Sequence, residues 1–105
     1  MKPSARKCLQ AMAHQESLEN WADAELVCKG TVCYLKSKRI YWHTVKEMLQ
    51  LLTISSRGSE GNIQRYMLNS VGRSILRRPE LEQEVKDAQA KGGSWTIQFD
   101  KVARL

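Results

Sequence analysis

The stretch from Ile54 to Leu76 limits the possible folds most, because its hydrophobic period changes from strand-like to helix-like. Leu52–Ser55 alternates between apolar and polar residues, and Ile63–Leu68 points successive side chains to opposite faces, as two paired strands would. Between them, Arg57–Asn62 contains two glycines and small polar residues, which suit a tight solvated turn. The pattern predicts a two-strand ribbon with a basic tip at Arg57.

A helix is predicted on each side of this ribbon. Before it, the segment from Ile40 to Leu52 carries an apolar stripe with i, i+3, i+4 and i+7 spacing, made by Val45, Met48, Leu49 and Leu52. After it, Asn69 is a suitable N-cap for a short helix from Ser70 to Arg77, whose inward residues are Val71, Ile75 and Leu76. The sequence therefore predicts the order helix, ribbon, helix.

The N-terminal third is predicted to begin with a helix from about Ser4 to His14, with Cys8, Leu9, Met12 and Ala13 on its apolar face. The segment 23–35 fits two interpretations. Apolar residues recur at a helical period from Leu18 to Val27, but a hairpin through Lys29-Gly30 would pair Glu25–Cys28 with Thr31–Leu35. We favour the hairpin, followed by a basic loop over residues 36–39.

The C-terminal segment 79–105 is predicted to extend the domain by a helix and a strand. Pro79 suits the first turn of a helix, and the glutamates that follow it complement the helix dipole, so a helix is expected from Pro79 to Lys91. After Gly92-Gly93, strict alternation over Ser94–Asp100 predicts a half-buried strand. This strand would close the sheet or add to a partner's edge.

A chain of 105 residues supports one domain with one modest core, so residues 1–105 are expected to form a single α+β unit. No apolar run approaches the roughly 20 residues that a membrane span requires. No apolar segment follows the basic residues at the N-terminus, so a secretory signal is not expected. These features predict a cytoplasmic protein without membrane association.

The three cysteines do not have the number or spacing of a disulfide framework, which favours reduced, buried thiols. A zinc site is the alternative, built from Cys28, Cys33 and His43 with Cys8 or His14. Zinc knuckles usually place two cysteines closer together than Cys28 and Cys33. No metal and no cofactor are therefore expected.

The net charge of +6 is concentrated in the middle of the chain. Residues 28–78 contain ten basic and two acidic residues, whereas residues 1–27 and 79–105 each have a net charge of −1. The basic segment coincides with the predicted helix and ribbon, which favours a nucleic-acid partner. A solvated basic surface would explain the charge alone equally well.

The segment from Tyr66 to Arg73 has the pattern aromatic-x-Leu-Asn-x-x-Gly-Arg. It resembles the second wing strand and the following helix of bacterial winged helix-turn-helix regulators, over a match from Ile40 to Leu76. The resemblance implies a winged-helix-like domain, in which helices pack with a short antiparallel wing sheet and Tyr41–Leu52 enters the major groove. One departure is that Thr31–Arg39 replaces the small-residue turn that usually precedes the recognition helix.

Carried over to this chain, the resemblance assigns DNA contacts to two groups of residues. Base-reading side chains on the helix would be His43, Thr44, Lys46 and Gln50. Phosphate contacts would be Lys36, Lys38, Arg39, Arg57 and Arg65. The same helix residues could instead be an ordinary polar surface. Two-fold pairing would lengthen the site, so a homodimer is expected.

Motifs for catalysis are lacking, because the chain has no phosphate-binding glycine loop, no metalloprotease helix pair and no recognisable nucleophile, histidine and carboxylate set. We therefore expect that the protein is not an enzyme. The sequence favours a small sequence-selective DNA-binding protein, a transcriptional regulator of phage or mobile-element type. The alternative is a non-catalytic protein-interaction module on the same scaffold.

Overall fold

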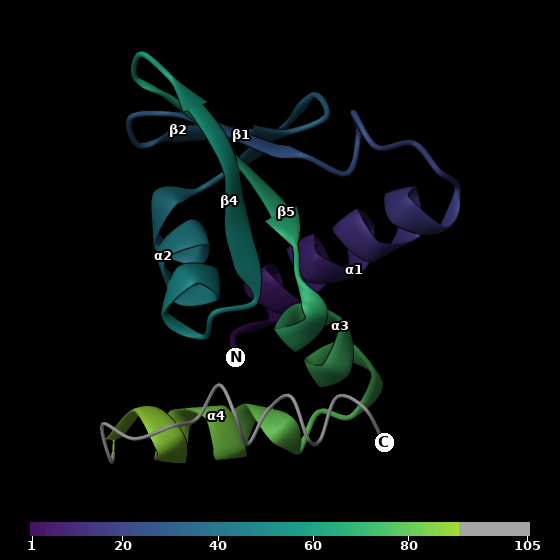
Figure 1. Cartoon of the computed structure of the whole chain (residues 1–105), viewed down its shortest axis with the longest axis vertical. Coiled ribbons are helices and arrows are strands. Elements are labelled where there is room, and N and C mark those ends of the chain that lie inside the picture. The colour runs from purple at the N-terminus through teal and green to yellow at the C-terminus, as the bar shows by residue number, and fades with distance from the viewer. Residues whose placement is uncertain (91–105) are drawn as a thin grey trace.

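The computed structural model describes residues 1–90, which form four helices and a five-stranded antiparallel sheet. The elements in chain order are α1 (Pro3–Ser17), β1 (Leu26–Lys29), β2 (Val32–Leu35), β3 (Lys38–Ile40), α2 (Trp42–Gln50), β4 (Ile54–Glu60), β5 (Ile63–Leu68), α3 (Ser70–Arg77) and α4 (Leu81–Ala90). The small α+β fold is confirmed. The predicted order helix, ribbon, helix is also confirmed, as α2, β4–β5 and α3 (Figure 1).

The strands are ordered β3-β2-β1-β5-β4 across the sheet. The favoured hairpin is confirmed as β1–β2, with Gly30 at its turn in the left-handed region (φ 61°). The predicted basic loop is wrong in part. Lys36 adopts a positive φ of 58°, so the chain reverses within two residues and Lys38–Ile40 pairs with β2 as an edge strand. The pairing of β1 with β5 joins this hairpin to the ribbon.

The ribbon is longer than the sequence predicts, and this moves Arg57 away from its tip. β4 continues to Glu60, and the turn consists of Gly61-Asn62, where Gly61 has a φ of 61°. Arg57 lies instead at a β-bulge between Ser56 and Gly58. The expected basic tip is therefore wrong, because Glu60 is the charged residue beside the turn.

The main core lies between one face of the sheet and the helices α1 and α2. Its fully buried members include Leu9 and Met12 of α1, Leu26 of β1, and Val45 and Met48 of α2. The helix before the ribbon ends at Gln50 rather than Leu52. Leu52 has a φ of 59°, which turns the chain into β4, and Leu49 and Leu52 are only half-buried.

A smaller cluster joins α3 to α4. It consists of Val71, Ile75, Leu81 and Val85. The predicted C-terminal helix is present, but it begins at Leu81 because Pro79 and Glu80 form a turn. Figure 1 shows α4 at the end of the molecule away from the β4–β5 turn. The predicted helix end at Gly92-Gly93 and the strand over Ser94–Asp100 lie outside the described residues.

Asn69 connects α2, β4 and α3, and its predicted N-cap role is confirmed. Its side-chain oxygen accepts a hydrogen bond from the Gly72 N–H at 2.9 Å. Its side-chain nitrogen donates to the Leu52 carbonyl at 2.7 Å and to the Ser55 hydroxyl at 2.8 Å. The start of α3 is thereby fixed against the turn between α2 and β4. Of the helices in residues 1–90, none is both long enough and apolar enough to cross a membrane.

Cys28 and Cys33 form a disulfide across β1 and β2, so the expectation of reduced thiols is wrong for this pair. The antiparallel register places the two residues directly opposite each other, with 4.0 Å between their Cα atoms. The two cysteines lie on adjacent paired strands. Their spacing in the sequence had implied a wide loop between them. The bond uses both thiols that the alternative zinc site required, and Cys8 is a free, buried thiol on α1.

Reducing the disulfide is expected to lower the free energy of unfolding by about 2 kcal/mol, because it closes a short loop. Urea unfolding with and without dithiothreitol measures this difference. A protein with both Cys28→Ala and Cys33→Ala is the control, since its stability should not respond to the reductant. Equal midpoints for the unsubstituted protein under both conditions, with the oxidised bond verified by thiol titration, would contradict the prediction.

Candidate nucleic-acid interface

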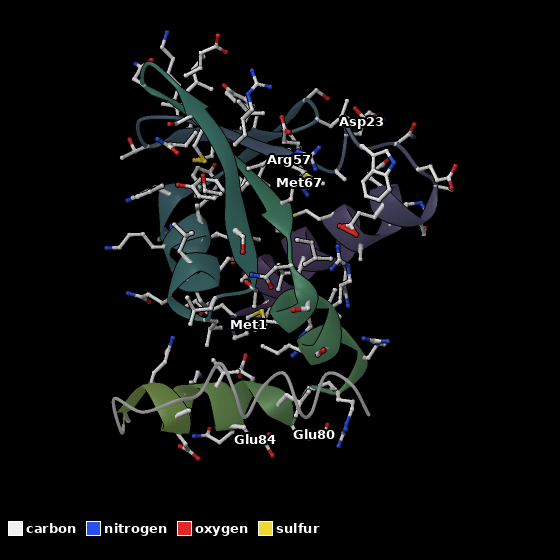
Figure 2. All side chains as sticks on the ribbon, viewed as in Figure 1. Met1, Asp23, Arg57, Met67, Glu80 and Glu84 are labelled. Carbon is white, nitrogen blue, oxygen red and sulfur yellow. A yellow bond between two sulfur atoms is a disulfide. The ribbon has the colours of Figure 1, made fainter. Side chains whose placement is uncertain are left out.

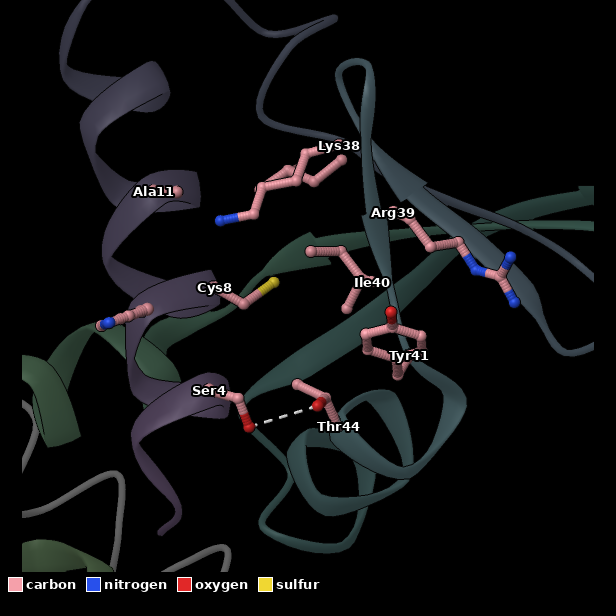
Figure 3. A pocket seen from close by; sticks show the side chains of 10 residues that line it. Ser4, Cys8, Ala11, Lys38, Arg39, Ile40, Tyr41 and Thr44 are labelled. Carbon is pink, nitrogen blue, oxygen red and sulfur yellow. Dashed lines mark hydrogen bonds between the residues drawn. The ribbon is translucent and has the colours of Figure 1, made fainter.

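The exposed face of α2 presents three of the four side chains predicted to read bases. His43, Lys46 and Gln50 are exposed, whereas Thr44 is only 4% exposed. The Thr44 hydroxyl donates to the Ser4 hydroxyl of α1 at 3.3 Å (Figure 3). Thr44 shares the inward stripe with Met48, so its predicted DNA contact is wrong for a geometric reason.

The two ends of α2 differ in their access to a ligand. At the C-terminal end, the side-chain amide of Gln89 on α4 donates to the Gln50 carbonyl at 2.5 Å. In the middle, the carboxylate of Glu47 accepts a hydrogen bond from the Lys2 backbone N–H at 3.0 Å. Glu47 is the one acidic residue of the helix, and this contact joins its carboxylate to the N-terminal segment. The N-terminal half of α2 therefore has an exposed face with His43 and Lys46 on it.

Lys38 and Arg39 lie on opposite sides of β3, because successive strand residues alternate between faces. Figure 3 shows the Lys38 side chain directed toward α1 and the Arg39 side chain directed to the other side of the strand. The Arg39 guanidinium lies 5.9 Å from the ring centre of Tyr34 and 5.8 Å from that of Tyr41. We call the sheet face that carries Arg39, opposite α1 and α2, the outer face.

The other predicted phosphate contacts belong to the sheet and its turns rather than to α2. Arg65 of β5 is on the outer face and forms an ion pair with Glu25 at 3.1 Å. Arg57 is exposed at the bulge opposite Arg65, and it has no ion pair with any residue among 1–90. The ammonium nitrogen of Lys36 lies 3.8 Å from a carboxylate oxygen of Asp23. Figure 2 shows Arg57 on the ribbon, and Glu84 of α4 and Glu80 of the preceding turn at the other end of the molecule.

The nine predicted residues are thus not brought together at one site. His43, Lys46 and Gln50 lie on α2, whereas the Lys38 side chain is directed toward α1. Arg39 and Arg65 lie on the outer face, Arg57 lies at the bulge of β4, Lys36 lies in the β2–β3 turn, and Thr44 is buried. Lys7, Tyr34 and Tyr41 are not among the predicted residues. The pairing of Tyr34 with Arg39 depends on the β2–β3 register, which follows from the positive φ of Lys36, and a lysine does not signal such a turn.

A groove of about 300 Å³ lies between α1 and the β3–α2 junction (Figure 3). Apolar groups from Ala11, Leu35 and Ile40 line it together with the basic residues Lys7 and Lys38, and Arg39 borders it with its guanidinium directed to the other side of β3. Cys8 also lines the groove. Burial raises the pKa of its thiol to about 11, despite the opposing effect of the Lys38 charge, so the thiol is protonated and weakly nucleophilic at neutral pH.

Comparisons with protein-family models, with curated proteins and with solved structures found no match to this chain. The candidate function therefore rests on the side chains themselves and on where the fold places them.

Proposed function

We propose that the protein binds duplex DNA through the N-terminal half of α2, as a small sequence-selective regulator that acts as a homodimer. One observation carries the proposal. The exposed face of α2 combines the hydrogen-bonding side chains of His43 and Lys46, while Glu47 is held by the N-terminal segment. A helix with such a face fits the major groove in size and in charge.

The roles of the side chains follow from their chemistry. His43 and Lys46 can donate to guanine acceptors or to phosphate, and Gln50 can make a paired contact with adenine. Gln50 is the weaker candidate, because α4 contacts the same end of the helix. Lys38 and Lys7 are suited to phosphate contacts, which supply affinity without sequence information. The resemblance to winged helix-turn-helix regulators supports this assignment of α2. The assignment stays a prediction.

Removing single cations beside α2 should weaken binding to all duplex sequences by a similar factor. Lys38→Ala and Lys46→Ala are each expected to reduce the slope of log affinity against log salt concentration by about 1. Gel shifts with mixed-sequence duplex over a range of salt concentrations measure this slope. Arg77→Ala is the matched control on α3, and its slope should equal that of the unsubstituted protein. An unchanged slope for Lys46→Ala would reject α2 as the contact surface.

Sequence preference should depend on the first turns of α2. His43→Ala is expected to reduce the discrimination between a selected site and random DNA by about 1–3 kcal/mol, with little change in non-specific affinity. Site selection from a random pool, repeated with His43→Ala, Lys46→Ala and Gln50→Ala, tests this expectation. Arg57→Ala should keep the preference, because Arg57 lies on the sheet. Identical preferences for all three α2 variants would show that this helix does not read bases.

The groove between α1 and β3 supports the second candidate, a protein-interaction module. Its apolar lining suits one apolar side chain, and Lys7 and Lys38 suit acidic neighbours of that side chain in a partner. Duplex binding at low salt separates the candidates. A protein that fails to bind duplex DNA at low salt would favour the interaction module over the regulator.

A further inference from the structure

The outer face carries a row of side chains that crosses four strands. The register aligns Arg39 of β3 with Tyr34 of β2, Tyr34 with Val27 of β1, and Val27 with Arg65 of β5. The row therefore has an aromatic and apolar centre with a guanidinium group at each end. The duplex contacts proposed for α2 do not require this row, because α2 lies against the opposite face of the sheet.

The aromatic side chains at the Arg39 end of the row are open to solvent. Tyr34 is 43% exposed, and Tyr41, which lies next to the row at the start of α2, is 63% exposed. Arg39 lies over both rings, and Tyr41 stacks on His43 with 5.9 Å between the ring centres and 7° between the ring planes. These contacts restrict the side chains before a ligand arrives, which lowers the entropy cost of stacking against them.

The charges around the aromatic centre are mainly positive. Arg57 lies at the bulge opposite Arg65, and the neighbouring position Gly58 has no side chain that would cover the face. Lys29 is exposed at the end of β1. Glu25 is the acidic residue nearest to the row, and its carboxylate is already paired with Arg65. A phosphate chain along this face would meet cations on both sides of Tyr34.

We propose that the outer face binds single-stranded nucleic acid, with an unpaired base stacked on Tyr34 and the phosphates held by Arg39 and Arg57. Exposed aromatic rings on a sheet with flanking cations bind single strands in this way, because every base has a face that can stack. Base pairs inside a duplex do not offer this face. The site is therefore selective for unpaired bases, and it adjoins the α2 surface through the stack of Tyr41 on His43.

Substitutions at Tyr34 test the role of the ring. Fluorescence anisotropy with a labelled oligodeoxythymidine measures the affinity for a single strand. Tyr34→Leu keeps an apolar side chain but removes the stacking ring, and it is expected to weaken binding about 5- to 100-fold. Tyr34→Phe keeps the ring and should bind like the unsubstituted protein. Trp21→Ala removes an exposed aromatic side chain from the segment between α1 and β1, and it should have no effect.

A second probe separates stacking from charge. A strand of the same length that lacks its bases keeps the phosphates, so the unsubstituted protein should bind it more weakly than oligodeoxythymidine by a similar factor. Arg57→Gln should weaken binding to both strands. Equal affinity for the two strands would overturn the proposal. Equal affinity of Tyr34→Leu and Tyr34→Phe for oligodeoxythymidine would also overturn it.

Duplex binding at the α2 surface and single-strand binding at the outer face can be lost independently. Tyr34→Leu should retain the duplex affinity and salt slope of the unsubstituted protein, whereas Lys46→Ala should retain the affinity for oligodeoxythymidine. Loss of single-strand binding in both variants would contradict a separate site on the outer face. Circular dichroism melts of each variant establish that the protein is folded, and Tyr34→Phe repeats the comparison without removing the ring from the sheet.

Discussion

Replacing Gly72 by alanine is expected to destabilise the protein by about 1–3 kcal/mol, although alanine is normally the better helix former. A Cβ atom at this position in α3 would lie 2.5 Å from the Thr53 carbonyl oxygen and 2.5 Å from a methyl carbon of Leu68. The Leu68 side chain can rotate away, but the backbone at Thr53 cannot move freely. Thr53 also accepts a hydrogen bond from the Asn69 N–H at 3.1 Å, so a shift there would disturb the start of α3.

Urea unfolding of Gly72→Ala measures the effect, and Ser70→Ala is the matched control. Ser70 is the exposed first residue of the same helix, so its replacement should change stability by less than about 0.5 kcal/mol. The decisive result is whether Gly72→Ala lowers or raises the free energy of unfolding. An increase in stability, as helix propensity alone predicts, would show that α3 does not pack closely on the turn between α2 and β4.

Replacing Ile75 by alanine is expected to cost about 2–5 kcal/mol, because it leaves a cavity where the side chain is fully buried. Ile75 belongs to the cluster that joins α3 to Leu81 and Val85 of α4. Its loss should therefore also weaken the docking of α4. Urea unfolding gives the total cost, and hydrogen exchange of the α4 amides shows whether that helix opens before the rest of the protein.

Two half-buried leucines serve as comparisons for Ile75. Leu76→Ala, at the next position of α3, and Leu49→Ala, on α2, should each cost less than Ile75→Ala because both residues are partly exposed. The sequence pattern alone placed Leu49 on the same inward stripe as Met48. A loss below about 0.5 kcal/mol for Ile75→Ala would show that α3 does not use this face for packing.

The fold could be predicted where local signals agree with each other. The stripe around Val45 and Met48, the alternation in Ile63–Leu68 and the cap at Asn69 are each encoded within a few residues, and all three are present in the structure. The prediction failed where backbone dihedral angles decide the result. Positive φ angles at Lys36 and Leu52 end one element and begin another, and neither residue type signals such a turn.

The candidate site was harder to predict, because it depends on pairing between distant residues. The sequence correctly placed His43 and Lys46 on the exposed side of a helix. It could not show that Thr44 would face α1, since this depends on how two helices pack. Nor could it show the disulfide between Cys28 and Cys33, which follows from a strand register fixed by the turn at Gly30.

The short strand β3 places one cation on each side of the sheet by the parity of residue positions alone. Lys38 faces α1 and Arg39 faces the aromatic row because they are neighbours on a pleated strand. Deletion of one residue from the preceding turn would exchange their positions, moving arginine to the groove and turning Ile40 toward solvent. The length of the two-residue turn at Lys36-Ser37 is thus a determinant of which surface receives which cation.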